Sequence, residues 1–247
     1  MYQISIKNYL EKHGFEALRP KAVLFDMDGV LYDSMPRHSI AWQQSMAKFG
    51  IRMTADDAYA TEGARGVDTI RKMVWEQQGR KIDEAEAQLM YDEKTRIFHE
   101  QTEAPIMPGI PELMQKLCDE GILCCVVTGS GQRPLINRIL SDFGAYVDES
   151  RITTAYDVKQ GKPHPDPYLM GLQKAGGLKP WEAVVVENAP LGIRAGVAAR
   201  IFTIGVNTGP LPDQTLLDAG ADLLFPSITE LCESWETHYA LMQSPLL

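Results

Sequence analysis

The sequence predicts an α/β protein in which a doubly wound parallel sheet is interrupted, near its start, by an all-helical insert. Short apolar runs that are typical of buried strands lie at residues 22–26, 122–127, 183–186 and 201–204. Helical segments alternate with these runs, and that alternation is typical of parallel sheets. Between residues 34 and 103, helical patterns follow one another without a convincing strand. This contrast predicts a helical domain inserted into an α/β domain.

The composition is typical of a soluble globular protein and disfavours nucleic acid or a membrane as partner. The 247 residues are 45% apolar and 23% charged, and the formal net charge is −9. Phosphate backbones and anionic membranes require a basic surface. No apolar run is long enough to span a bilayer, and we expect no signal peptide. We expect a cytoplasmic monomer whose four cysteines, which form no CxxC pair, are free thiols.

The first elements are a short helical pattern in residues 1–20 and the strand at 22–26. We expect the first segment to extend the surface of the core domain. The insert that follows is expected to form helices at 36–49, 55–61, 67–78 and 83–101. Gly50 and Gly79 are suited to end two of these helices, and Thr54 with Asp57 resembles a capping box. We therefore expect a cap domain at 35–104 and a core domain at 1–34 and 105–247.

The rest of the chain alternates between helices and strands. Pro111, Pro134 and Pro190 are each placed to open a helix, because proline suits the first helical turn. A further helix is expected at 166–176 and a last one near 227–240. The expected strands are those at 122–127, 152–154, 183–186, 201–204 and 223–225.

Polar residues follow four of these segments at positions where catalysis is common. They are Asp26 and Asp28, the run Thr128-Gly129-Ser130, Lys162, and Glu187 with Asn188. The carboxyl ends of parallel strands share one edge of a sheet, so these residues should converge. Two carboxylates held close together repel each other unless a cation lies between them. We therefore expect a Mg²⁺ site in which one aspartate is also a nucleophile.

Each signal alone has an ordinary structural explanation. Asp26 and Asp28 could cap a helix, but a calcium loop of the EF-hand type would need an acid at Arg37. The Thr128 run could be a simple turn, a lone Lys162 is most often solvated, and Asn188 could cap the helix after it. No GxGxxG follows a strand, which disfavours a dinucleotide-binding dehydrogenase. The combination in this order favours a phosphate-handling active site.

In order and spacing, the set resembles the haloacid dehalogenase (HAD) superfamily of phosphotransferases. Asp26-Met27-Asp28-Gly29-Val30 is similar to the first motif of that family, and Thr128-Gly129-Ser130, Lys162-Pro163 and Glu187-Asn188 are similar to the other three. The resemblance implies a Rossmann-like core. The helical insert resembles the capped branch that includes β-phosphoglucomutase and phosphoglycolate phosphatase. Dehalogenases proper are disfavoured because Asp28 supplies the second acid of the phosphotransferases.

The resemblance implies a mechanism for these residues. Asp26 would attack phosphorus and become an aspartyl phosphate, while Asp28 would protonate the leaving oxygen and later accept a proton. Mg²⁺ would be held by the Asp26 carboxylate, the Asp28 carbonyl and the fourth motif, Glu187 and Asn188. The loop Thr128, Gly129 and Ser130, with Lys162, would hold the phosphoryl oxygens.

One position departs from the family pattern. The fourth motif of the family usually ends in aspartate, whereas this chain has Asn188, which removes a negative charge at the metal. Glu62, in the cap, is the best candidate to replace that charge as a metal ligand. The alternative is that Glu62 is a solvated acid at a helix end.

The cap loop around Glu62 bears on the substrate. In β-phosphoglucomutase-like enzymes this loop carries a lysine and an arginine that grip the sugar phosphate. Here those positions read Glu62 and Gly66, with Arg65 one residue early. This difference favours a sub-branch whose members include an inorganic pyrophosphatase.

Three functions stay open on these residues. The favoured one is a Mg²⁺-dependent phosphohydrolase acting on a small phosphorylated substrate, pyrophosphate above all. A β-phosphoglucomutase is the alternative, since His38, Trp42 and Lys94 match positions of the mutase branch. A non-catalytic phosphate-binding protein is the third, and the presence of Asp26, Asp28 and Lys162 weighs against it.

Overall fold

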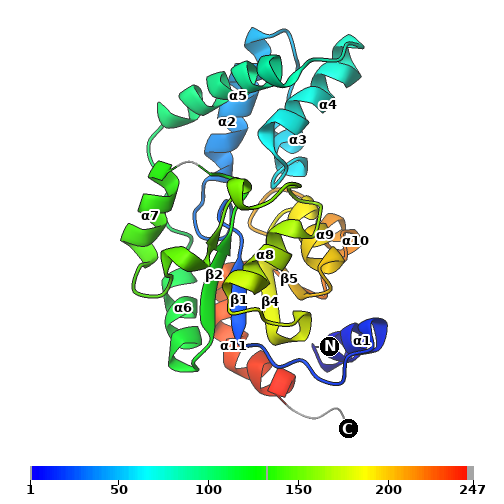
Figure 1. Ribbon diagram of the computed structural model, residues 1–247, viewed down its shortest axis with the longest axis vertical. Coiled ribbons are helices and arrows are strands. Elements are labelled where there is room, and N and C mark those ends of the chain that lie inside the picture. Colours follow the sequence, from blue (N-terminus) through cyan, green and yellow to red (C-terminus); the bar gives the residue numbers. More distant parts are fainter. Residues whose placement is uncertain (1, 132, 244–247) are drawn as a thin grey trace.

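The computed structural model describes residues 2–131 and 133–243, and these residues form a parallel sheet below a helical cap (Figure 1). Within the described residues, the sheet has six strands in the order β3-β2-β1-β4-β5-β6. The strands are β1 (Ala22–Phe25), β2 (Leu123–Val127), β3 (Ile152–Thr153), β4 (Ala183–Glu187), β5 (Phe202–Val206) and β6 (Leu223–Phe225). The predicted fold class is confirmed.

Strand β1 lies at the centre of the sheet. It pairs in parallel with β2 on one side and β4 on the other, so that Phe25 lies beside Val126 and Val186. Apart from Glu187 at the end of β4, all three strands are apolar, and they are almost wholly buried, as expected when helices cover both faces of a parallel sheet. The order of the strands reverses on either side of β1, which places the ends of β1, β2 and β4 at a crevice.

Helices cover both faces of the sheet, and alternate residues of each strand face them. The helices of the α/β part are α1 (Tyr2–His13), α6 (Ile110–Asp119), α7 (Arg133–Phe143), α8 (Asp166–Lys174), α9 (Pro190–Ala198), α10 (Asp213–Asp218) and α11 (Ile228–Gln243). Val23 and Phe25 belong to a core with residues of α1, α6, α7 and α11, whereas Leu24 packs with residues of α8 and α9.

The inserted segment forms helices α2 (Met35–Lys48), α3 (Ala55–Ala60), α4 (Gly66–Gln78) and α5 (Glu84–His99). In this segment, which is described throughout, no residue belongs to a named strand. A separate hydrophobic cluster, which includes Met46, Ile70 and Met90, holds these helices together. Thr54 and Asp57 form the predicted capping box, and Gly79 ends α4 with φ of 66°. The domain boundaries at 34/35 and 104/105 stay a prediction.

Two parts of the α/β domain differ from expectation. Residues 2–13 form a regular helix, α1, and its Ile6, Tyr9 and Leu10 are buried in the main core rather than lying on a surface extension. The Tyr9 hydroxyl also donates a hydrogen bond to the carbonyl of Arg200 at 2.9 Å. Helix α10, which packs against β6 and α9, was not expected. Its six residues are too few to show a clear helical period in the sequence.

None of the helices in the described part of the chain is both long and apolar enough to cross a membrane.

Candidate active site

Two of the predicted strand-end residues, Asp26 and Glu187, meet at the amino group of Lys162. Lys162 Nζ contacts Asp26 Oδ1, lies 2.7 Å from Glu187 Oε1 and donates to the carbonyl of Val127 at 3.1 Å. The side chains of all three charged residues are buried. Burial lowers the pKa of Lys162, but the charges of Asp26 and Glu187 outweigh it and hold the pKa above its ordinary value. Lys162 is therefore a permanent cation beside Asp26.

Glu187 is saturated with hydrogen bonds. Its Oε1 also accepts from the Tyr168 hydroxyl at 3.0 Å, and its Oε2 accepts from the backbone N–H groups of Asn188 and Ala189 at 2.9 Å each. A side chain at Gly192 would overlap this carboxylate, so glycine is required there. In the structure Glu187 positions Lys162, and its metal ligation stays a prediction.

Asp26 is the buried carboxylate at the end of β1. Burial raises its pKa to about 7, because the neighbouring charges of Glu187 and Asp28 add to the cost of burial and Lys162 offsets only part of it. A further cation at this carboxylate would restore its charge at neutral pH.

Asp28 lies in a different environment, on the cap side of the site. Its Oδ1 accepts a hydrogen bond from the Ser34 hydroxyl at 2.6 Å and lies 3.1 Å from His38 Nε2. Burial raises the pKa of Asp28, but the charge and hydrogen bond of His38 and the hydrogen bond from Ser34 bring it down to about 2. The two aspartates of the DxDG turn therefore have opposite pKa shifts.

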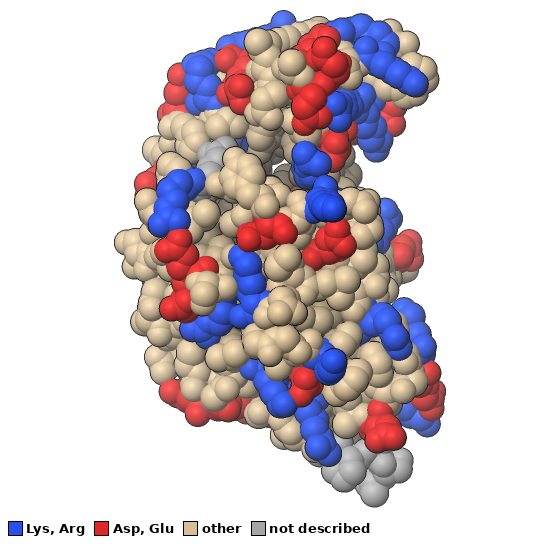
Figure 2. Space-filling model, viewed as in Figure 1, with Lys and Arg blue, Asp and Glu red and all other residues tan. Residues whose placement is uncertain are grey.

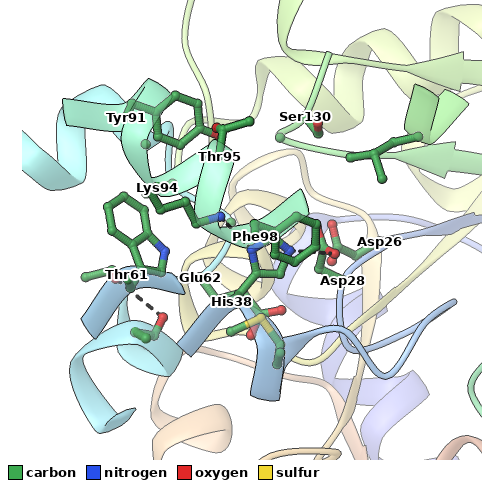
Figure 3. Close-up of a pocket in the computed structure, with 18 residues that line it drawn as sticks. Asp26, Asp28, His38, Thr61, Glu62, Tyr91, Lys94, Thr95, Phe98 and Ser130 are labelled. Carbon is green, nitrogen blue, oxygen red and sulfur yellow. Dashed lines mark hydrogen bonds and ion pairs between the residues drawn. The ribbon is translucent and has the colours of Figure 1, made fainter. Parts of the chain in front are cut away.

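Lys94 completes a chain that runs from the cap to Asp28. Its Nζ lies 2.6 Å from His38 Nδ1. The same atom lies 5.3 Å from the ring centroid of Trp42 and 5.0 Å from that of Phe98. Burial lowers the pKa of Lys94 to about 8, and Asp28 opposes that shift. Burial and the charge of Lys94 lower the pKa of His38. The predicted cap residues His38, Trp42 and Lys94 are thus brought together. Figure 3 shows His38 and Lys94 side by side.

Glu62 reaches from the cap into the core site. Only 8% of it is exposed, and both its carboxylate oxygens accept from Asn188 Nδ2 at 3.1 Å. Burial and the nearby charge of Asp26 raise the pKa of Glu62 well above its ordinary value, against the hydrogen bond from Asn188. The alternative of a solvated acid at a helix end is therefore wrong.

Asn188 packs directly on the DxDG turn. A Cβ atom at Gly29 would lie 2.1 Å from Asn188 Nδ2, and Gly29 has φ of 82°, so both space and backbone conformation require glycine. This glycine lets the fourth motif and the first motif touch.

The loop Thr128-Gly129-Ser130, whose phosphate binding stays a prediction, is held by backbone hydrogen bonds. The backbone N–H of Ser130 donates to Thr128 Oγ1 at 3.0 Å, and the N–H of Thr128 donates to the carbonyl of Thr153 at 2.9 Å. A Cβ at Gly129 would lie 3.4 Å from the carbonyl oxygen of Gly63 in the cap. The loop therefore faces the same cap segment that carries Glu62.

A cavity of about 80 Å³ lies between these groups. Its lining includes Asp26, Asp28, Glu62, His38, Lys94 and Ser130, and Figure 3 shows their side chains around a common space. Among the described residues that line it, Lys94 is the only lysine or arginine. The cavity lies where the cap meets the core, because residues of both line it.

Arg65 lies outside this cavity, although it was predicted as a substrate-binding cap residue. Its side chain lines a second groove and packs over Gly161, where a Cβ would lie 2.8 Å from Arg65 Cγ. Sequence reasoning also missed Ser34 and Tyr168, which hold Asp28 and Glu187. The position of Ser34 just before Pro36 is a helix-start signal that could have indicated a polar role for its hydroxyl. No pattern in the sequence points to Tyr168.

The residues around Asp26 fit a magnesium ion. Among the described residues, Asn188 Oδ1 is buried and accepts no hydrogen bond. It lies with the Asp26 and Glu62 carboxylates in an all-oxygen set, which hard cations prefer. No cluster of three or more His, Cys, Asp or Glu side chains suited to a metal occurs in the described part of the chain. Mg²⁺ does not require one, because it is commonly held by one or two carboxylates with water and substrate phosphate.

Comparisons with known proteins agree with this geometry. Residues 20–200 match the model of the haloacid dehalogenase-like hydrolase family. The chain is 34% identical to hexitol phosphatase A of Escherichia coli, over 87% of this chain and 94% of the other. It is 29% identical to β-phosphoglucomutase of Bacillus subtilis, over 88% and 96%.

A solved structure described as a putative β-phosphoglucomutase from Bacteroides vulgatus is 46% identical, covers 98% of each chain and superposes with a TM-score of 0.94. The family match covers all four strand-end motifs and the cap between them. This chain is therefore a member of the haloacid dehalogenase-like hydrolase family, in its β-phosphoglucomutase-like branch.

Proposed function

We propose that the protein is a Mg²⁺-dependent phosphohydrolase that acts through an aspartyl phosphate at Asp26, with inorganic pyrophosphate as the favoured substrate. One observation carries this proposal: Glu62 of the cap is buried against Asn188 beside Asp26, in a cavity of about 80 Å³. A cap residue in that position fills space that a sugar phosphate would need. It leaves room for a compact anion.

The charge around the cavity supports the same substrate class. The mutase-type arginine position reads Gly66, and Arg65 lies in another groove. A sugar bisphosphate would therefore lack an arginine for its second phosphate. Lys94 and His38 are the groups that face the side of the cavity away from Asp26, and they suit a small leaving group such as phosphate (Figure 3).

In the first step, an oxygen of Asp26 attacks the phosphorus of pyrophosphate. A P–O bond forms to Asp26 while the bridging P–O bond breaks and releases phosphate. Lys162 holds Asp26 in place and balances the charge of the transferred phosphoryl group, together with the Thr128-Gly129-Ser130 loop. Mg²⁺, held by Asp26, the Asp28 carbonyl, Asn188 and Glu62, would neutralise the phosphoryl oxygens.

In the second step, a water molecule attacks the phosphorus of the aspartyl phosphate and restores the Asp26 carboxylate. Asp28 accepts the proton from water, having given one to the leaving phosphate in the first step. With a pKa of about 2 the Asp28 carboxylate is ready as the acceptor, and its earlier role as donor requires that the negative charge of bound pyrophosphate raises this pKa and loads the proton. Ser34 and His38 hold that carboxylate toward the cavity.

A β-phosphoglucomutase is the second candidate, and two observations favour it. The names of two relatives, from Bacillus subtilis and Bacteroides vulgatus, describe or suggest that activity. The Asp28–His38–Lys94 chain also matches positions of the mutase branch. Relatives named as phosphatases of phosphorylated carbohydrates support sugar phosphates as a broader substrate class. A cytoplasmic location and a monomeric state remain predictions.

A substrate panel separates these functions. Purified protein with Mg²⁺ is given pyrophosphate, β-glucose 1-phosphate with trace bisphosphate, and a generic aryl phosphate. We expect phosphate release from pyrophosphate with the highest kcat/KM. If glucose 6-phosphate formed faster than phosphate was released, the protein would be a mutase and the proposed hydrolase function would be wrong. If no substrate were turned over, the protein would be a non-catalytic phosphate-binding protein.

A further inference from the structure

A second groove, of about 690 Å³, lies on another side of the cap–core junction and collects basic side chains. We call it the basic groove and define it by Arg65, Lys72, Lys159, His164 and Arg194, all of which line it. Asp68 is the one acidic residue among its described lining residues. In a chain with a net charge of −9, such a local excess of cations is unusual. Figure 2 shows basic side chains bordering the hollow between cap and core.

The charges of the basic groove are only partly neutralised within the protein, since Lys72 lies 3.9 Å from Glu76 and His164 lies 3.0 Å from Asp166. Lys159 and Arg194 are exposed, and neither makes an ion pair with any described residue. Arg65 lies 4.0 Å from Asp68, and the two side chains are 42% and 54% exposed. Pairs at that distance and exposure contribute little. The groove therefore offers two cations, Lys159 and Arg194, that have no ion-pair partner among the described residues, beside Arg65 and Lys72, whose pairs are long and exposed.

The basic groove has one wall on each domain. Arg65 precedes helix α4 of the cap and Lys72 lies within it, whereas Lys159 lies in a core loop and Arg194 lies on α9. The Arg65 side chain packs over Gly161, so it already contacts the core wall. An anion bound here would contact cap and core together.

The basic groove also lies behind the catalytic lysine. Gly161, Lys162 and Pro163 form part of its floor, while Lys162 Nζ points away to Asp26. Neither Asp26 nor Asp28 lines the groove. The basic groove and the catalytic cavity are therefore different spaces that adjoin at the cap loop, where Thr61 and Ala64 line both.

We propose that the basic groove binds a compact polyanion with two or more phosphoryl groups, and that the bound anion ties the cap to the core. Several cations spread through one groove match several phosphoryl groups better than one. Since the rest of the chain is acidic, a long nucleic acid would meet repulsion beyond the groove. The proposal does not depend on which substrate the catalytic cavity takes.

Titration calorimetry with inorganic tripolyphosphate tests this site in metal-free protein, with a chelator present and the ionic strength fixed. Without a metal, the carboxylates of the catalytic cavity repel the probe, so binding reports the basic groove. The core-wall variant is Lys159→Gln/Arg194→Gln and the cap-wall variant is Arg65→Gln. The matched control is Lys7→Gln/Lys12→Gln, which removes two exposed charges from α1.

We expect one tripolyphosphate per chain, with the affinity reduced about tenfold or more in each groove variant and unchanged in the control. Thermal denaturation of all four proteins without the probe checks that the variants are folded. Wild-type affinity in the core-wall variant would place the anion elsewhere and overturn the site. Wild-type affinity in Arg65→Gln would contradict the tie between cap and core. If the groove variants lost no more affinity than the control, the loss would reflect the change in net charge and would overturn the site.

Discussion

Asn188 donates its amide Nδ2 to both carboxylate oxygens of Glu62, at 3.1 Å each, and so joins the last motif of the core to the cap. The contact is buried and leaves Asn188 Oδ1 without a hydrogen-bond partner among the described residues. A metal bound at that oxygen would also gain the Glu62 charge. On the proposed function, a chain with asparagine in the fourth motif would in this way keep the negative charge around a bound metal.

Glu62→Gln should weaken the dependence of activity on Mg²⁺. Glutamine keeps the size of the side chain but removes the charge, so we expect the Mg²⁺ concentration for half-maximal activity to rise about tenfold or more. Asp68→Asn, an exposed change in the same cap segment, is the control. An unchanged Mg²⁺ requirement in Glu62→Gln would show that Glu62 has a structural role only and does not bind the metal.

Tyr168→Phe should lower turnover, because Tyr168 holds Glu187 and Glu187 in turn positions Lys162. The substitution removes one of the hydrogen bonds to Glu187 without creating a cavity, and a lost bond to a buried charge costs about 1–3 kcal/mol. We expect a lower free energy of unfolding, measured by denaturant titration, and a lower kcat with little change in KM. Tyr156→Phe, at an exposed tyrosine, is the control. Full kcat in Tyr168→Phe would show that Glu187 positions Lys162 without Tyr168.

The convergence of the four motifs could be predicted from the sequence because parallel strands share one edge. Runs such as Val184–Val186 are apolar enough to identify as buried strands, and the polar residues after them must then lie together. The cap could be predicted for a similar reason, since Thr54 with Asp57 and Gly79 mark helix ends locally.

Contacts between distant segments could not be predicted in the same way. Tyr168 lies within a helix whose apolar pattern gives it no special place, yet its hydroxyl reaches Glu187. Arg65 is one residue from the expected substrate position, and that single step turns its side chain into another groove. Helix α1 carries a weak apolar pattern, so its burial depends on α11 and the sheet edge rather than on its own sequence.

Lys94→Met should raise the pKa of His38. Burial lowers this pKa first, and the charge of Lys94 at 2.6 Å from His38 Nδ1 lowers it further. Removing that charge favours the protonated imidazole, so the pKa must move up. NMR titration of the five histidines in metal-free protein measures the shift, with Lys81→Met as the surface control. An unchanged or lower His38 pKa would contradict the close contact.

Asp222→Asn should change how stability depends on pH. Burial raises the pKa of Asp222 to about 6, against the hydrogen bond from the Thr203 backbone and the charge of Lys12. The folded protein then binds a proton that the unfolded chain has lost, so this group stabilises the fold at low pH and the effect disappears as pH rises through about 6.

The free energy of unfolding, measured from pH 4 to pH 7, should therefore fall less in Asp222→Asn than in the wild type. Asparagine keeps an oxygen that can accept from the Thr203 N–H, which lies 2.8 Å from Asp222 Oδ2. Asp119→Asn, at an exposed acid, should reproduce the wild-type curve. Parallel curves for wild type and Asp222→Asn would show that Asp222 does not change its protonation on folding.

The central claim is that Asp26 takes the phosphoryl group from pyrophosphate, and acid-quenched peptide analysis tests it most directly. Wild-type protein with Mg²⁺ is mixed with ³²P-labelled pyrophosphate, quenched during turnover and digested. We expect the label on the peptide that contains Asp26, and we expect Asp26→Asn to carry no label and to lose at least about 10³-fold in kcat. Rapid phosphate release by the wild type without a labelled peptide, or by Asp26→Asn, would contradict the account.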